Sequence, residues 1–322
     1  VKKVDVVSGY IHRGIEKLCE DLTYPSLLLY TERMDYMGAH MNRHATCLCI
    51  EKALGIEVPH RAEVIRMMMD ELMRLSSHLL SYGCLTMDQG ATTAFFYGFR
   101  EREYIYDIFD KTCGARMSMS YDTIGGVVRD VHPDFVNDVR KACDAIEKAI
   151  PEYHKLFSGN VIALGRMKDV GTLSLEDAKN YAITGPSGRA SGFHCDVRKT
   201  HPYSLYNEVE FDEVVYENGD SYDRYTVRMK EMEQSIKILR QCCDMMDKEG
   251  HQGEFCAKVP KIIKLPKGHW YQQVEASRGA FGVYLESDGE GKPFQHPYRI
   301  HFQSPCFNLV GVVDLTCKNN LI

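Results

Sequence analysis

The chain has 322 residues, 44% of them hydrophobic, and a formal net charge of -6 at pH 7. This length and apolar content suit one large domain or two modest ones with an ample core. The negative charge argues against nucleic acid or an anionic membrane surface as an electrostatic partner of the whole chain. No apolar run approaches the roughly 20 residues that a membrane-spanning helix needs.

The sequence opens Val-Lys-Lys, without a methionine or a signal-peptide pattern, and it ends soon after an apolar stretch. We therefore expect the given chain to be incomplete at both ends. Its 12 cysteines include no Cys-x-x-Cys pair, which excludes the common zinc and iron–sulfur signatures. A chain of this length needs no disulfide frame, so reduced thiols are expected.

The first part of the chain is predicted to be mainly helical. Residues 4–11 would finish a strand whose partners precede them. Residues 16–36 predict two short helices separated near Pro25, because proline disfavours helix in the residue before it. Apolar periodicity with glycine or proline boundaries predicts further helices over 37–55, 59–83, 95–113, 133–157 and 223–246, and a short one beginning at Ser174.

The stretch 185–192 is rich in glycine but lacks the ending of a P-loop and the spacing of a dinucleotide fingerprint. We interpret it as a tight connection. Beyond residue 250 the pattern becomes β-rich, with 270–276 and 282–289 predicting a hairpin and 297–303 a further strand. The predicted fold class is α+β, a central helical bundle with small flanking β-sheets.

The segment 9–36 mixes charged residues with leucines and tyrosines. It includes Arg13 and Arg33, whose guanidinium groups are costly to bury beside apolar side chains unless an anion requires them. By composition alone, a solvated helix edge explains the same pattern. The segment is therefore either a surface helix edge or a site for something anionic.

His40 and His44 lie one helical turn apart, a spacing that would let them share a metal. The intervening Arg43 would repel a cation, and the glutamate of a zincin is absent, so we favour an ordinary helix-face pair. No Gly-x-Ser-x-Gly elbow occurs, and the scattered cysteines offer no preferred nucleophile. The sequence thus predicts no metal site.

Two polar residues stand in apolar surroundings, Tyr36 and Asp88. A phenol and a carboxylate in an apolar cavity are suited to protonating a reduced, oxygen-bearing ring. The alternative is a hydrogen-bonded core tyrosine and a helix-capping aspartate. Their separation in the sequence does not by itself bring the two together.

These residues lie in stretches that resemble one family. The chain is similar over nearly its whole length to the NuoD or 49-kilodalton subunits of NADH-quinone oxidoreductase (respiratory complex I). The matching motifs are His12-Arg-Gly-Ile-Glu-Lys17, Arg33-Met-Asp-Tyr36, Phe95-Phe96-x-x-Phe99-x-Glu101-Arg102-Glu103, Gly114-Ala-Arg-Met117, Asp196-Val-Arg-Lys-Thr200, Gly219-Asp-Ser-Tyr-Asp-Arg-Tyr225 and Gly282-Val-Tyr-Leu-Glu-Ser-Asp-Gly289.

The resemblance implies a fold like that of the related [NiFe] hydrogenase large subunits, which are also the rival interpretation. In those enzymes an Arg-x-Cys-Gly-x-Cys motif supplies the first pair of nickel ligands. Aligned on Arg33, that motif would need cysteines where this chain has Asp35 and Gly38. A hydrogenase-type large subunit is therefore disfavoured.

By the same resemblance, Tyr36 would hydrogen-bond the quinone headgroup. Asp88 would be the acid linked to a quinone-binding histidine in a loop upstream of the given chain. Arg13 and Arg33 would lie near the terminal [4Fe–4S] cluster, which the partner subunit NuoB holds. Quinone, either menaquinone or ubiquinone, would be the substrate, and the chain itself would bind no metal, flavin or nicotinamide.

The implied function is electron transfer from that cluster to quinone between NuoB and this subunit, which drives proton pumping elsewhere in the complex. The other expected partners are NuoC, NuoI and NuoH, with NAD bound by other subunits. The expected location is peripheral, on the cytoplasmic side of the inner membrane. A structural scaffold that has lost quinone chemistry is the second alternative, disfavoured because Tyr36 and Asp88 are both present.

The expected organisation is a single NuoD-type domain over 1–322. Residues 1–12 would end an N-terminal sheet, 13–250 would form a mainly helical bundle, and 251–322 a β-rich C-terminal part.

One departure from the family concerns Ser118, where many members have a histidine near the cluster. A serine cannot gain a proton as the cluster gains an electron, so we expect a lower and less pH-dependent cluster potential, which suits a low-potential quinone such as menaquinone.

Overall fold

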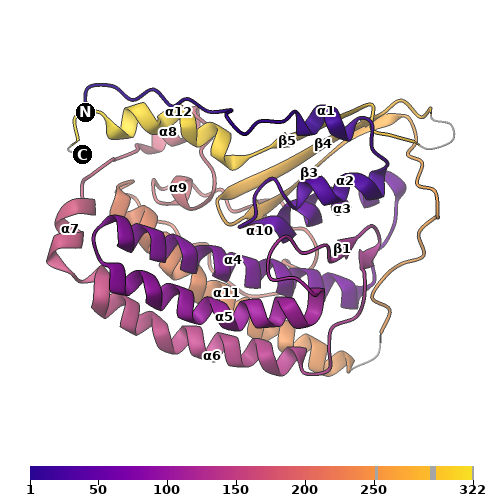
Figure 1. Ribbon diagram of the computed structural model, residues 1–322, viewed down its shortest axis with the longest axis horizontal. Helices are drawn as coiled ribbons and strands as arrows, with labels where there is room; N and C mark the ends of the chain where they lie inside the picture. The colour runs from indigo at the N-terminus through magenta and orange to yellow at the C-terminus, as the bar shows by residue number, and fades with distance from the viewer. Residues whose placement is uncertain (251–252, 291–294, 321–322) are drawn as a thin grey trace.

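The computed structural model describes residues 1–250, 253–290 and 295–320. Long helices fill one half of the molecule, and a three-stranded sheet with short helices lies along the other half (Figure 1). This arrangement confirms the predicted α+β class. The two chain ends lie together at one corner, where the Val1 ammonium group donates to the Asn320 carbonyl oxygen at 2.9 Å.

Four long helices form the bundle: α4 (His60–Asp88), α5 (Thr92–Cys113), α6 (Phe135–Tyr153) and α11 (Ser221–Glu249). Helix α4 packs against both α5 and α11, and α6 packs against the same two helices. The apolar stripes predicted from three- and four-residue spacing face this core. Within the described ranges, no helix combines the length and the apolarity needed to cross a bilayer.

Helix α3 (Ala39–Leu54) connects the bundle to the sheet, because it contacts both α4 and strand β3. It ends as predicted at Gly55, whose φ of 64° is the left-handed conformation that glycine adopts without strain. The two short helices predicted before it are α1 (Ile15–Cys19) and α2 (Tyr24–Thr31), with the proline in the first turn of α2.

The main sheet is antiparallel in the order β3 (Gly268–Ala276), β4 (Gly279–Ser287), β5 (Arg299–Gln303). The predicted hairpin is therefore confirmed, although β4 begins earlier than expected. A second, two-stranded hairpin of β1 (Asp122–Thr123) and β2 (Gly126–Val127) lies against α3 and α4. The remaining elements are α7 (Val161–Met167), α8 (Leu175–Asn180), α9 (Gly185–Arg189), α10 (Val197–Thr200), α12 (Pro305–Cys317) and a π-helical turn, η1 (His154–Ser158).

Helix α4 does not end near Gly83 as predicted. The glycine lies within the helix because its missing side chain leaves room for Phe95 and Phe99 of α5, whose rings would meet an added Cβ at 3.4 and 3.3 Å. The helix continues for more than one further turn and ends at Asp88. Asp88 is consequently the last helical residue and does not follow the helix.

Three other segments differ from the prediction. Residues 4–11 form no strand; the segment ends in a turn at Tyr10–Ile11, and the Val4 amide donates to the Asp314 carboxylate of α12 at 2.6 Å. The proposed N-terminal sheet over 1–12 stays a prediction, since its partner strands were expected upstream. The glycine-rich stretch contains the short helix α9, and the apolar stretch before the C-terminus is α12.

Helices α4 and α5 approach closely at Gly98, which yields a stability prediction. A methyl group there would meet the Leu79 carbonyl oxygen at 2.9 Å and Tyr82 Cδ1 at 3.0 Å. We expect Gly98→Ala to lower the free energy of unfolding by about 1–3 kcal/mol in urea titrations, because the helices must move apart. Gly165→Ala in α7, with no atom within 4 Å of the added methyl, should instead be neutral or stabilising by up to about 1 kcal/mol. Equal effects of the two substitutions would contradict this account.

Candidate functional site

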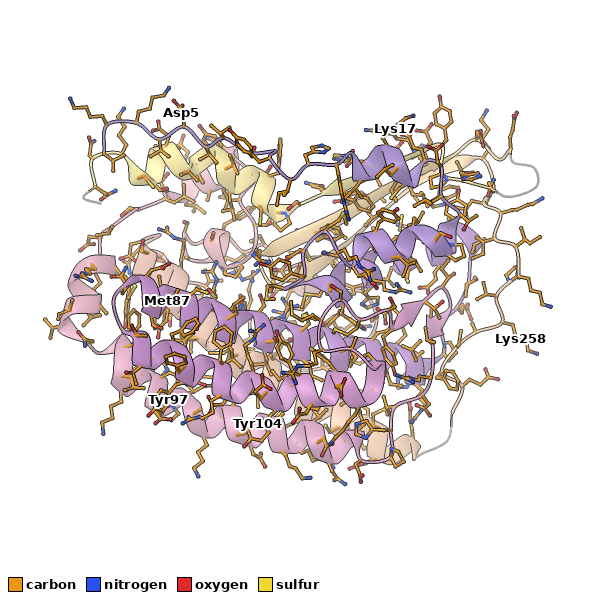
Figure 2. The ribbon with its side chains drawn as sticks, in the orientation of Figure 1. Asp5, Lys17, Met87, Tyr97, Tyr104 and Lys258 are labelled. Atoms are coloured by element: carbon orange, nitrogen blue, oxygen red, sulfur yellow. The ribbon has the colours of Figure 1, made fainter. Side chains whose placement is uncertain are left out.

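A cleft of about 750 Å³ opens between the N-terminal segment, α1, the sheet and the start of α12. Lys17, labelled in Figure 2, marks the α1 side of this cleft. The apolar part of its lining consists of Ile11, Ile15, Met34, Phe281, Phe302 and Pro305. A concave, largely apolar surface with a few charged groups is the usual form of a small-molecule site.

Arg13 belongs to this cleft. It lies between exposed His12 and Gly14, and Gly14 has a left-handed φ of 64°. The Gly14 amide donates to His12 Nδ1 at 2.8 Å, which fixes the turn that presents the arginine. Within the described residues, no carboxylate lies within ion-pair distance of Arg13. Its guanidinium group is therefore available to an anion from outside the chain.

Asp35 forms the opposite side of the cleft through an ion pair with Arg278, which lies in the β3–β4 turn. The other Asp35 oxygen accepts the Met37 amide at 3.0 Å. A Cβ on Gly38 would lie 3.2 Å from the Asp35 carboxylate. At the two positions where a hydrogenase needs cysteines, this chain thus has an aspartate held in an ion pair and a glycine that precedes α3.

Tyr36 follows Asp35 directly and its side chain is 59% exposed. It stands next to the cleft and is not one of the residues that line it. Arg33 also faces solvent, and its guanidinium donates to Glu32 at 2.8 Å and to the Leu29 carbonyl oxygen at 2.9 Å. Arg13 therefore lines the cleft, and Tyr36 lies beside Asp35 at its edge. Arg33 precedes Tyr36 by three residues.

Asp88 is not brought to this region. It is exposed in the last turn of α4, and its neighbour Met87 lies at the opposite side of the molecule from Lys17 (Figure 2). Within the described residues, no hydrogen bond or ion pair joins Asp88 to Tyr36. The roles of all four candidate residues stay predictions.

The chain is similar to known proteins over nearly its whole length. Residues 88–322 match the family described as respiratory-chain NADH dehydrogenase, 49 Kd subunit. The D subunit of NADH-quinone oxidoreductase from Bacillus cytotoxicus is 41% identical over 322 residues, which is 100% of this chain and 86% of that relative. The chain belongs to the NuoD family of complex I subunits. The resemblance that the sequence motifs indicated is thereby confirmed.

Other members of the NuoD family are more similar to this chain. The C/D subunit of NADH-quinone oxidoreductase from Bacteroides fragilis is 53% identical over 318 residues, and that of Bacteroides thetaiotaomicron is 52% identical over 318 residues. Each alignment covers 99% of this chain and 58% of the relative. The chain therefore spans somewhat more than half the length of these C/D relatives.

Beneath the cleft, this NuoD-family chain buries a cluster of two histidines and two aspartates. His40 Nδ1 and His44 Nδ1 lie 2.8 and 2.7 Å from the two oxygens of Asp70, and His40 Nε2 lies 3.1 Å from Asp122 Oδ1. All four side chains are inaccessible to solvent. The two histidines thus share a carboxylate; within the described ranges, no set of three or more ligating side chains converges as a metal site would require.

The charge of His40 depends on these carboxylates. Burial alone would lower its pKa, but Asp122 and Asp70 outweigh burial and raise the pKa to about 9. Burial likewise opposes the charged form of His44, and Asp70 is the main group that nevertheless raises its pKa. The His40 imidazole is accordingly protonated near neutrality, and its charge offsets those of the buried carboxylates Asp70 and Asp122.

Further buried polar contacts of this NuoD-family chain join α4 to α3 and to α11. Arg66 of α4 forms a bidentate pair with Glu51 of α3, with N–O distances of 2.7 and 3.0 Å. Glu71 accepts from Tyr206 at 2.7 Å and from Ser235 at 2.6 Å. Sequence reasoning missed this network because the charged residues Arg66, Asp70, Glu71 and Arg74 lie outside the apolar stripe of α4, on a face that is usually solvated but is buried here.

All twelve cysteines lie in the described part of the chain, and Cys306, on the cleft, is the one exposed thiol. The others are buried or half-buried. Burial raises the pKa of Cys19 to about 11 and that of Cys49 to about 12. These buried thiols stay protonated and behave as small apolar side chains.

The histidine cluster predicts a specific dependence of stability on pH. Because the pKa of His40 is raised from 6.5 to about 9, its stabilising contribution is fully present below pH 6.5 and is lost as the pH rises through about 9. The shift corresponds to roughly 3 kcal/mol. In urea titrations across this range, we expect the unfolding free energy of the wild type to fall more steeply than that of His40→Gln. His194→Gln, which removes an exposed histidine, should keep the wild-type slope; equal slopes for wild type and His40→Gln would contradict the assignment.

Proposed function

We propose that this chain forms one wall of the quinone-reduction site of a NADH-quinone oxidoreductase, facing a NuoB-type partner. The observation that carries the proposal is the apolar cleft beside Tyr36, with Arg13 in its lining and no carboxylate of the described residues paired with that arginine. Support also comes from the relatives, which are named as subunits of that oxidoreductase. A quinone is a flat, apolar ring with polar oxygens, so its site requires both apolar side chains and polar or charged ones.

Within this proposal, Tyr36 donates a hydrogen bond to a carbonyl oxygen of the quinone. Charge develops on that oxygen during reduction, so the hydrogen bond is stronger in the transition state than in the bound ground state. The exposed phenol next to the cleft is free to do this, because within the described residues its hydroxyl makes no hydrogen bond. The family resemblance alone supports Asp88 as the acid linked to an upstream histidine, because the structure places Asp88 away from Tyr36 and the cleft.

A [4Fe–4S] cluster on the NuoB-type partner would supply the two electrons, one at a time. In the described part of this chain, no group of cysteines converges to hold a cluster, which fits ligation by a partner. The exposed guanidinium groups of Arg13 and Arg33 fit such a neighbour. Their charge would raise the electron affinity of the cluster, and its negative charge would offset the cost of removing them from water.

The proposal extends to the assembly. The remaining partners are NuoC, NuoI and NuoH; the C/D name of the Bacteroides relatives favours a close association with a NuoC-type part. The chain would be peripheral on the cytoplasmic side of the membrane, with NAD bound by other subunits and proton pumping in membrane subunits. Menaquinone or ubiquinone would be the substrate.

The two competing functions make different demands on named residues of this chain. A hydrogenase-type large subunit needs thiolates there, and the Asp35–Arg278 ion pair occupies one position. A scaffold without quinone chemistry would show no dependence on the Tyr36 hydroxyl. Removal of that hydroxyl therefore separates the proposed function from the scaffold.

Tyr36→Phe tests the proposed headgroup contact. The substitution removes one hydroxyl and little volume, so we expect quinone reductase activity of the assembled complex to fall about tenfold or more at limiting quinone, because a hydrogen bond to developing charge is lost. Tyr104→Phe on the outer face of α5, where the tyrosine is 49% exposed, should leave the activity unchanged. An intact complex with full activity after Tyr36→Phe would place the quinone elsewhere or leave the chain a scaffold.

Ser118 supplies a second test. The residue is half-buried with a positive φ of 52°, a conformation that histidine tolerates better than most residues. In redox titrations of the complex, we expect the cluster potential to change little with pH in the wild type. Ser118→His should raise the potential and make its pH dependence approach about 59 mV per unit, the value for one proton per electron. A steep dependence in the wild type would refute the role of this position.

A further inference from the structure

A second cavity, of about 330 Å³, lies between the C-terminal half of α4, the helix α9 and the first turns of α11. It shares no lining residue with the cleft. Helix α4 supplies His78, Ser81, Tyr82 and Leu85, α9 supplies Ser187, and α11 supplies Ser221, Arg224, Tyr225, Arg228 and Met229. The lining thus combines two guanidinium groups with three serine hydroxyls, and it contains no carboxylate.

Most buried arginines of the described chain pair with a carboxylate, with Arg102 as the exception, whereas the two partly buried arginines of this cavity do not. Arg189 forms ion pairs with Glu231 and Glu275 at 2.5 and 2.8 Å. Arg224 and Arg228, in contrast, have no carboxylate within ion-pair distance among the described residues. A partly buried cation without a counter-ion is costly unless an anion from outside completes the site.

The hydrogen bonds of the two arginines leave most of the Arg228 donors unused. Arg224 is held by the carbonyl oxygens of Gly219 at 2.6 Å and Gly171 at 2.8 Å, and by Ser221 Oγ at 3.0 Å. Arg228 donates only from Nη1, to the Arg224 carbonyl oxygen at 2.6 Å, among the described residues. Its Nε and Nη2 are therefore available in the fork geometry that matches two oxygens of one anion.

Two hydroxyls complete the set of donors. Ser81 and Ser187 line the cavity from α4 and α9, and neither side chain makes a hydrogen bond to another described residue. Together with Arg228 they approach the cavity from three different elements. Donors that converge from several directions suit a tetrahedral oxyanion better than a planar carboxylate.

The nearby acids of the described chain form no ion pair with either arginine. Burial lowers the pKa of Arg224 against the opposing charges of Asp220 and Asp223, yet neither carboxylate lies within ion-pair distance of it. Glu231, one turn beyond Arg228 on α11, is already bound by Arg189 and by His78 at 2.7 Å. Asp88, one turn beyond Leu85 on α4, makes no ion pair with either arginine within the described ranges. Burial lowers the pKa of Arg228 to about 10, against the opposing effect of Glu231 and with further lowering by Arg224 and Arg278. The guanidinium is still charged at neutral pH.

We propose that this cavity binds a phosphate group, with Arg228 as its bidentate partner and Arg224, Ser81 and Ser187 around it. The phosphate is either free inorganic phosphate or the headgroup of a phospholipid. This cavity and the cleft share no lining residue, so the phosphate test can fail while the Tyr36 test succeeds.

The test measures phosphate bound per assembled complex. Wild-type complex in phosphate-free buffer is dialysed to equilibrium against radiolabelled inorganic phosphate, beside the Arg228→Met variant. We expect the wild type to bind one more phosphate than the variant, whose affinity should fall tenfold or more. Arg240→Met, which removes an exposed arginine of the same helix that is paired with Asp144 and Glu147, should bind as the wild type does.

A second arm separates the two sources. Phospholipid phosphorus retained after detergent delipidation is determined for the same three complexes. One phospholipid fewer in Arg228→Met, with no inorganic phosphate bound by the wild type, assigns the site to a lipid headgroup. Equal phosphate and equal phospholipid in all three complexes would overturn the proposal. If Arg228→Met fails to assemble, Arg228→Lys and Ser187→Ala take its place. Each should weaken binding several-fold, and unchanged binding in both would equally overturn the proposal.

Discussion

Two adjacent carboxylates on helix α4, Asp70 and Glu71, hold the centre of this fold together. Both are fully buried, and because they are neighbours on a helix they point toward different elements. Asp70 binds the two histidines of α3. Glu71 binds Arg198 of α10 at 3.0 Å and Ser235 of α11 at 2.6 Å. Removing either carboxylate would leave several buried cations or donors without partners, a far larger cost than the loss of one surface ion pair.

This network also determines what surrounds the cleft. Helix α3 begins just after Asp35 and Tyr36, so the histidines that fix α3 against α4 fix the chain entering it. On the far side, Arg278 reaches Asp35 from the β3–β4 turn. The cleft therefore has one wall anchored in the bundle and one in the sheet. Pre-organisation of this kind lowers the entropy cost of binding a rigid ring.

Local sequence signals predict much of the fold, but they do not predict the buried ion pairs of Asp70 and Glu71. Apolar spacing predicts the long helices, and glycine bends predict the β3–β4 hairpin, because both signals lie within one element. Gly83 misled the prediction for α4, since a glycine that admits aromatic rings from α5 resembles a helix end. Helix α12 was missed although Ser304 and Pro305 form a recognisable N-terminus, with the Cys306 amide donating to Ser304 Oγ at 3.3 Å.

In the candidate site, too, the sequence indicates individual residues but not which of them come together. The motifs indicated Tyr36, Asp88, Arg13 and Arg33 by family likeness, and no spacing rule brings residues so far apart in sequence into contact. The Asp70 cluster joins residues from three elements, so its pairing depends on tertiary packing that local patterns do not contain. Because Asp70 lies outside the apolar stripe of α4, the local pattern predicts a solvated side chain there.

The distribution of thiols gives the molecule a natural reporter. Eleven cysteines are wholly or partly enclosed, while Cys306 stands exposed at the margin of the cleft. A maleimide-linked fluorophore or spin label would therefore attach preferentially beside the cleft, on a chain with no engineered substitution. The label would report changes in the surroundings of the cleft in the native sequence.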